Sequence, residues 1–192
     1  MAETGVRKQR AAQTEAELKA AAIRVFARVG YLNAKITDIT AEAGRATGSF
    51  YQHFTSKEKL LEALMADLLA EGDAGALLDG HSDDFSDPAA IRWHIEQYWA
   101  VYRRHRTVIE ALRQAAIVDP QFDEAQQEMS KPDIVHLSRH MAKAAPSSGD
   151  PAVLASIFTL LVSTFAATWI DRLPDDEAIE TLTRFVYGGI NG

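Results

Sequence analysis

A run of seven residues, 47–53, carries the side chains best suited to bond to a nucleic acid. Their hydroxyl, amide and imidazole groups can reach phosphates or base edges. Gly48 has no side chain, which permits a close approach of the backbone, and Phe50 and Phe54 are expected to face inward. The polar candidates are Thr47, Ser49, Tyr51, Gln52 and His53.

Three basic residues flank this run as candidate phosphate ligands: Lys35, Arg45 and Lys57. The net charge of -7 is unusual for a protein that binds nucleic acid, but the charges are unevenly distributed. Residues 1–60 carry 10 Lys and Arg against 6 Asp and Glu, whereas residues 61–192 carry 10 against 21. The sequence therefore indicates a basic N-terminal module joined to an acidic remainder, whose charge is mostly a solubilising surface.

Short helices must position these residues. Apolar residues at spacings of three and four predict a helix from Thr14 that ends at Gly30. A second helix is predicted over 37–44, with Thr37 as its cap, and a third over 47–53 after a tight turn. Two short helices joined in this way are typical of a helix-turn-helix, in which the second helix enters the major groove of DNA.

The remaining pattern is also helical. A capping box, Thr55-x-x-Glu58, begins a fourth helix, and the Gly- and Asp-rich stretch 71–87 predicts a long loop. Later helices are expected to begin at Asp87-Pro88, near Thr107, at Asp150-Pro151 and at Pro174, with Asp119-Pro120 and Lys131-Pro132 as further breaks. No strand-like alternation occurs, so the predicted fold is all-α, with about nine helices. The predicted parts are a flexible arm (1–13), a helix-turn-helix domain (14–58) and a helical domain (59–192).

The helix predicted over 153–173 is apolar nearly all round, which indicates burial between two surfaces. In a dimer these would be its own core and the partner subunit. The alternative is a fully buried core helix of a monomer. Aromatic and Met side chains are also frequent in this half of the chain, and pockets for small molecules are largely apolar with a few polar groups. The candidate ligand-binding residues are Trp99, Tyr102, Met129, His136, Phe158 and Phe165.

Several kinds of chemistry are not expected. Cys is absent, which excludes disulfides and thiol nucleophiles, and no nucleophile–base pair or phosphate loop suggests an enzyme. His136 and His140 are four residues apart, but a pocket-lining pair is favoured over a metal site, so neither a metal nor a cofactor is expected. The sequence contains no run of about 18 apolar residues, so no membrane span is predicted. The N-terminus lacks the apolar stretch of a secretory signal. The expected location is the cytoplasm, without a membrane partner.

Four segments together carry a resemblance to a known family. They are Phe26-Ala-Arg-Val-Gly-Tyr31, Thr37-Asp-Ile-Thr-Ala-Glu-Ala-Gly44, Gly48-Ser-Phe-Tyr-Gln-His-Phe54 and Ser56-Lys-Glu-Lys-Leu-Leu61. In order, spacing and residue type, this region resembles the N-terminal domain of the TetR family of regulators. The resemblance implies a homodimer that binds a palindromic operator in double-stranded DNA and responds to a small-molecule effector. It also implies that the last two helices of each subunit form a four-helix bundle.

The resemblance assigns roles to individual residues. It implies phosphate contacts for Thr37, Tyr51, His53 and Lys57. Thr47, Ser49 and Gln52 would reach bases or nearby phosphates. Met129 and Phe165 are favoured as effector contacts, because they lie on helices that usually line the pocket in this family.

Two positions depart from the family pattern: Arg45 stands where a small aliphatic residue is usual, and Ala46 stands where a Ser or similar cap is usual. Thr47 is expected to take over the capping. The sequence favours a repressor released by a mainly apolar effector. The alternatives are an activator, an enzyme with its active site in the aromatic half, and a ligand-binding protein or three-helix bundle without a DNA partner.

Overall fold

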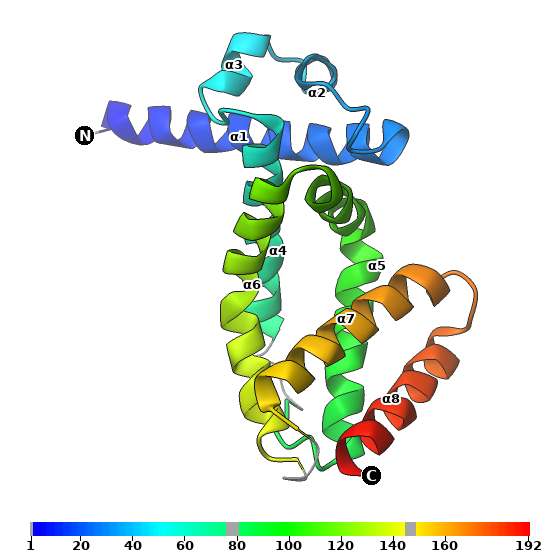
Figure 1. Ribbon diagram of the computed structural model, residues 1–192. Helices are drawn as coiled ribbons and strands as arrows, with labels where there is room; N and C mark the ends of the chain where they lie inside the picture. The colour runs from blue at the N-terminus through cyan, green and yellow to red at the C-terminus, as the bar shows by residue number, and fades with distance from the viewer. Residues whose placement is uncertain (1, 76–80, 145–148) are drawn as a thin grey trace. The chain divides into compact units, whose positions relative to one another are not determined.

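The computed structural model describes residues 2–75, 81–144 and 149–192, and the side chains of residues 5–72 within the first range. These residues form eight α-helices and no strand, which confirms the all-α prediction (Figure 1). The helices are α1 (Ala2–Val29), α2 (Ile36–Glu42), α3 (Thr47–Tyr51), α4 (Lys57–Gly75), α5 (Pro88–Val118), α6 (Pro120–Met141), α7 (Pro151–Trp169) and α8 (Asp175–Asn191).

The sequence predicts about nine helices and the described residues form eight, because α5 and α6 each continue through a predicted break. The helices expected to meet near Thr107 are one helix, α5, with a single non-helical residue, His105, at φ −113° and ψ 19°. The break expected at Lys131-Pro132 is also wrong, since Pro132 lies inside α6. Proline removes one helical hydrogen bond, but Pro132 is exposed, and there water can satisfy the carbonyl that loses its partner.

The chain folds as two compact units. Unit 1 comprises Met1–Leu68 and Thr107–Gln126, and unit 2 comprises Leu69–Arg106 and Gln127–Gly192. Unit 1 therefore contains the predicted helix-turn-helix domain and, in addition, the C-terminal end of α5 and the start of α6. The functional boundaries predicted at residues 13 and 58 stay predictions.

The N-terminal stretch is helical in the structure, since α1 begins at Ala2. Residues 7–13 are mostly Arg, Lys, Gln and Ala, which are good helix formers. Arg7, Lys8 and Arg10 are exposed on this part of α1. The flexibility of an arm over 1–13 remains a prediction, because the end of a helix can still fray where its residues, here 5–13, are all exposed.

The core of unit 1 is formed by the apolar face of α1 and the helices that pack against it. Leu18, Val25 and Ile39 are fully buried, and so are Phe50 and Leu60. In Figure 1, α2 and α3 lie on the same side of α1. Two turns depend on glycine in the left-handed region: Gly30 (φ 76°) ends α1 as predicted, and Gly44 (φ 64°) makes the turn between α2 and α3.

The last two helices of unit 2 form an antiparallel pair joined by a short turn (Figure 1). Asp150 caps α7 as predicted, because its Oδ1 accepts hydrogen bonds from the amides of Ala152 (2.8 Å) and Val153 (3.2 Å). One side of α7 is buried, through Phe158, Val162 and Ala166, among others. The opposite side exposes large apolar side chains: Val153, Ile157 and Leu160.

By length and composition alone, α7 could also cross a membrane, with a mean hydropathy of 1.8 and 22% of its most apolar window buried. This finding differs from the sequence prediction that no segment is apolar enough. One such helix is weak evidence for a span, because a core helix of a soluble protein passes the same test.

Candidate nucleic-acid interface and effector region

The start of α2 is fixed by a carboxylate rather than by the predicted Thr37 cap. The N-cap residue is Lys35, whose amide donates to Asp38 Oδ2 at 3.1 Å. Thr37 is the second residue of the helix and is exposed. Capping by Thr37 is therefore wrong, while Thr37 remains accessible for the phosphate contact that the sequence predicted.

The predicted cap of α3 is also wrong. Ala46 is the N-cap residue and provides no side-chain hydrogen bond, while Thr47 is already the first helical residue. The Thr47 hydroxyl lies 3.4 Å from the hydroxyl of buried Thr40, which links α3 to α2. The helix ends at Tyr51 rather than at His53.

The first turn of α4 holds a third cap that differs from the prediction. Ser56 Oγ, not Thr55, accepts the amide of Lys59 at 3.2 Å. Glu58, the predicted partner in a capping box, instead accepts a hydrogen bond from the Tyr31 hydroxyl at 2.9 Å. Because Ser56 caps the helix, the third position after the cap is Lys59, and Glu58 is not in the position that a capping box requires.

The third helix has a buried side and an exposed polar side, as predicted. Phe50 is 0% exposed and Phe54 6% exposed, and their ring centroids lie 5.6 Å apart. Tyr51 is 56% exposed, although it follows Phe50 directly. The other residues of the predicted polar face are exposed (Thr47, Gly48, Gln52) or half-buried (Ser49, His53). Unit 1 thus presents hydroxyl and amide groups on a short helix whose position is fixed by the core.

Two of the three flanking cations already have protein partners. Arg45 bonds to Glu17 through Nε (3.0 Å) and Nη2, so that carboxylate already neutralises part of its charge. Hydrogen bonds from Gln13 and from Arg45 lower the pKa of Glu17. Lys35, by contrast, is exposed at the start of α2.

Lys57 supports the turn that follows α1. Its Nζ donates to the carbonyl oxygens of Tyr31 (2.8 Å) and Ala34 (3.0 Å) and lies 4.1 Å from the centroid of the Tyr31 ring. Burial lowers the pKa of this ammonium group. Lys57 therefore has a structural role that sequence reasoning missed, because the carbonyls that it contacts are distant in the chain.

The predicted effector residues all lie in unit 2, but in different environments. Trp99 and Tyr102 are buried on α5, and the Trp99 indole donates to Asp175 at 2.9 Å. Phe158 is buried, with its ring centroid 5.6 Å from that of Phe85. Phe165 is half-buried, with Trp99 and Trp169 each 6.2 Å away, centroid to centroid. Met129 is half-buried, and His136 is exposed.

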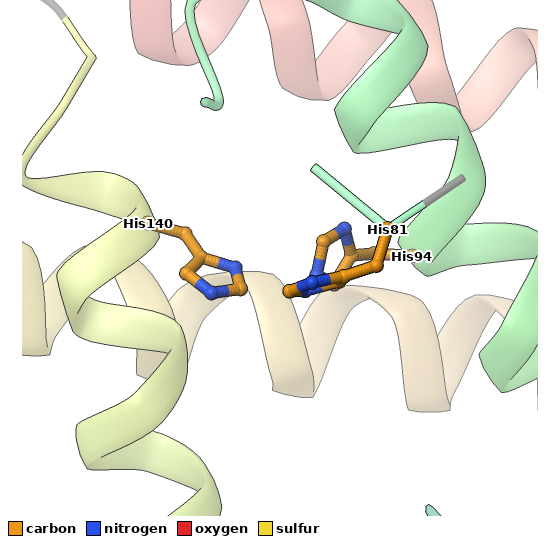
Figure 2. Close-up of side chains that lie close together, drawn as sticks. All are labelled: His81, His94 and His140. Carbon is orange, nitrogen blue, oxygen red and sulfur yellow. The ribbon is translucent and has the colours of Figure 1, made fainter. Parts of the chain in front are cut away.

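A cluster of histidines extends the predicted His136 and His140 pair, whose ring centroids lie 4.6 Å apart. His81, His94 and His140 each direct a ring nitrogen to the same place, and these three atoms lie within 4.8 Å of one another (Figure 2). Burial lowers the pKa of His94 and of His140 to about 4. Sequence reasoning missed this cluster, because only His136 and His140 have a spacing that indicates a shared helix face.

This geometry is that of a helix-turn-helix protein with an additional helical unit. Residues 18–64 match the family described as bacterial regulatory proteins, tetR family. The HTH-type transcriptional repressor NicS of Pseudomonas putida is 31% identical over 113 residues, which cover 57% of this chain and 51% of NicS. The match thus spans about half the length of that curated relative.

Solved structures match over most of the chain. The fatty acid degradation regulator FadR from Bacillus halodurans is 17% identical, with a TM-score of 0.69 over 92% of this chain and 95% of that chain. A transcriptional regulator from Saccharomonospora viridis in complex with choline is 18% identical, with a TM-score of 0.71 over 91% and 96%. At these identities the likeness shows a shared fold. Through the match of residues 18–64, the chain belongs to the TetR family of transcriptional regulators.

Proposed function

We propose that this protein is a ligand-responsive transcriptional repressor that binds a palindromic operator as a homodimer. The observation that carries the proposal is the exposed polar side of α3, held in place by buried Phe50. A helix of this kind enters the major groove, where Thr47, Ser49 and Gln52 would face bases and Tyr51 and His53 would face phosphates. The name of the relative NicS supports repression rather than activation.

The exposed apolar side of α7 supports the homodimer. Ile157 is 54% exposed and Leu160 67% exposed, and on the neighbouring helix Phe185 is 70% exposed. Apolar side chains grouped in this way on two adjacent helices are typical of a surface that a partner covers. Pairing α7 and α8 with their copies would give the four-helix bundle that the resemblance implies, and it makes a dimer a better explanation of α7 than a membrane span.

A small-molecule effector would act by shifting the population of dimers toward an arrangement that does not fit the operator. A dimer bound to successive major grooves needs its recognition helices about 34–36 Å apart, or a multiple of that distance. The aromatic and Met side chains of unit 2 favour a mainly apolar effector. A repressor of this kind acts in the cytoplasm.

The test of the proposal is selection of binding sites from random double-stranded DNA by the purified protein. We expect enrichment of a two-fold symmetric sequence with half-sites about one helical turn, or a multiple of it, apart. Affinity for the enriched duplex should exceed that for random DNA by about 1,000-fold or more. Recovery of random sequences only, at any salt concentration, would contradict the proposal.

Lys57→Ala is expected to have two separate effects. It removes the ammonium group from the carbonyls of Tyr31 and Ala34, which should lower stability by about 1–3 kcal/mol. If the third donor of the same ammonium group reaches a phosphate, the slope of log affinity against log salt concentration should also fall by about 1 per subunit. Chemical denaturation and DNA titrations at several salt concentrations measure the two effects.

The matched control is Lys131→Ala in unit 2, where an exposed lysine pairs with Glu128. It should change neither stability nor salt slope. A Lys57→Ala variant that is less stable but keeps the wild-type salt slope would show that Lys57 only supports the turn, and would remove it from the DNA contacts.

Met129→Trp is expected to block the effector and leave operator binding intact, because it adds a large side chain in unit 2 and leaves the helix-turn-helix unchanged. Fatty acids of increasing chain length and choline are suitable probes, since an apolar pocket should favour the longer chains. Coupling requires that a probe which lowers operator affinity binds the protein–operator complex more weakly, by the same factor. Equal probe affinity for free and operator-bound protein would exclude effector control by that probe.

A further inference from the structure

We propose that His81, His94 and His140 form a binding site for a divalent transition-metal ion, with Zn²⁺ as the best-fitting ion. The three imidazoles come from three separate parts of unit 2: the segment before α5, α5 itself and the last turn of α6 (Figure 2). The site lies within unit 2, so the inference stands whether or not the protein binds DNA.

The distances are compatible with coordination. One nitrogen from each ring lies within 4.8 Å of the other two. Tetrahedral zinc with Zn–N bonds of about 2.0–2.1 Å needs nitrogens about 3.3 Å apart. Side-chain rotations that bring the ring nitrogens closer together by at most about 1.5 Å would therefore complete the site. In Figure 2 the ring of His140 faces the rings of His81 and His94.

Hydrogen bonding indicates nitrogens that lack a partner. His81 Nε2 and His140 Nδ1 are buried and have no hydrogen-bond partner in the structure. His140 as a whole is only 2% exposed. Burying such a group without a partner costs about 1–3 kcal/mol, and buried polar atoms without a partner are therefore rare in native proteins. A metal ion between the rings would use these lone pairs.

His94 has the orientation that metal-binding histidines usually show. Its Nδ1 lies 2.8 Å from the carbonyl oxygen of Ala90, and because a carbonyl only accepts, Nδ1 must carry the proton. The lone pair is then on Nε2, away from the backbone. A hydrogen bond of this kind holds the ring in place and makes the opposite nitrogen a better ligand.

The donor set points to the class of ion. Three neutral imidazoles suit Zn²⁺, Cu²⁺, Ni²⁺ or Fe²⁺, whereas Mg²⁺ and Ca²⁺ prefer oxygen ligands. Three protein ligands leave a fourth position for water or for a donor atom of another molecule. The carboxylate of Asp83 interacts electrostatically with His94 and His140, and it partly offsets the charge of the ion.

The test is metal binding by the untagged protein. Zn²⁺ is titrated against a competing chelator, and Co²⁺ is added separately because tetrahedral Co²⁺ absorbs visible light strongly. We expect one ion per chain, an absorbance typical of tetrahedral Co²⁺ and a melting temperature that rises with metal concentration. Binding of no Zn²⁺ or Co²⁺ beyond the level of a protein that lacks the cluster would overturn the proposal.

His140→Leu is the most informative variant. It should weaken Zn²⁺ binding by at least about 100-fold, since loss of a ligand costs more than the 10–100-fold that loss of a supporting group costs. The same change removes a buried nitrogen without a partner, so metal-free stability should hold or rise. Should this variant fail to fold, His81→Ala tests the same ligand set at a half-buried position outside the helices.

His136→Ala is the matched control, because His136 is close to His140 but exposed and outside the set of three. It should change Zn²⁺ affinity by less than a few-fold. Equal loss of affinity in His136→Ala and His140→Leu would show that the ligands are not the three proposed, and wild-type affinity in His140→Leu would exclude the site.

Discussion

Replacement of Ile157 by Glu is expected to give a folded monomer that no longer binds the operator. Ile157 lies on the outward side of α7 and is 54% exposed within the subunit, so the carboxylate would be solvated in a monomer. In the proposed dimer the same carboxylate, once from each subunit, would be buried. An unpaired buried charge costs about 3–5 kcal/mol, which corresponds to a rise of more than about 100-fold in the dimer dissociation constant.

DNA affinity should fall with the dimer, because two linked recognition helices bind more tightly than either alone. Sedimentation velocity gives the oligomeric state, and circular dichroism shows whether the subunit is folded. Val162→Glu differs in that Val162 is 1% exposed, on the buried side of the same helix, and it should unfold unit 2 rather than separate subunits.

Ile117→Glu is the control for surface hydrophobicity. Ile117 is 82% exposed in unit 1, so the same chemical change occurs outside the proposed interface and should leave the dimer intact. The interface would have to lie elsewhere if Ile157→Glu sedimented as a stable dimer, or if Ile117→Glu dissociated it to the same extent.

Phe50→Ala is expected to abolish DNA binding through loss of the fold of the helix-turn-helix. Phe50 is 0% exposed and contacts the rings of Tyr51 and Phe54, each with a centroid distance of 5.6 Å. Removing a buried phenylalanine costs about 3–5 kcal/mol, which is a large share of the stability of a small domain. The expected result is a lower denaturation midpoint for unit 1 together with loss of operator binding.

The neighbouring variant Tyr51→Phe separates fold from contact. It keeps the aromatic ring beside Phe50 and removes only an exposed hydroxyl, so stability should change by less than about 0.5 kcal/mol. Loss of one hydrogen bond per subunit, at about 0.5–1.5 kcal/mol each, should weaken binding to all DNA sequences by about 10-fold in the dimer. Unchanged affinity in Tyr51→Phe would remove this hydroxyl from the contacts, and full stability in Phe50→Ala would contradict the role of Phe50 as core.

Local pattern determined most of the N-terminal unit. Apolar spacing from Leu18 to Phe26 defines the buried face of α1, although Val29, which continues the pattern, is 39% exposed. Gly30 and Gly44 occupy the two turns where a positive φ is required. The alternation of Phe50 and Phe54 with polar residues was enough to predict which side of α3 is exposed. These features depend on neighbours in the chain, and therefore the sequence alone determines them.

Caps and ion pairs were predicted less well, because each depends on which of several nearby oxygens is within reach. Ser56 rather than Thr55 caps α4, and Asp38 rather than Thr37 bonds at the start of α2. Lys57 reaches carbonyls of the turn after α1, which no local pattern indicates. The apolar composition of α7 predicted burial on several sides, but only the structure showed that Ile157 and Leu160 lie on the side its own subunit leaves uncovered.

The histidine cluster shows the same division most clearly. The sequence by itself determined that His136 and His140 share a face of one helix, because a spacing of four residues is close to one helical turn. Only the tertiary structure brought His81 and His94 to His140, by packing α5 and the segment before it against the end of α6. Ring nitrogens from three such segments converge through packing contacts between residues far apart in the chain, and helical periodicity carries no information about those contacts.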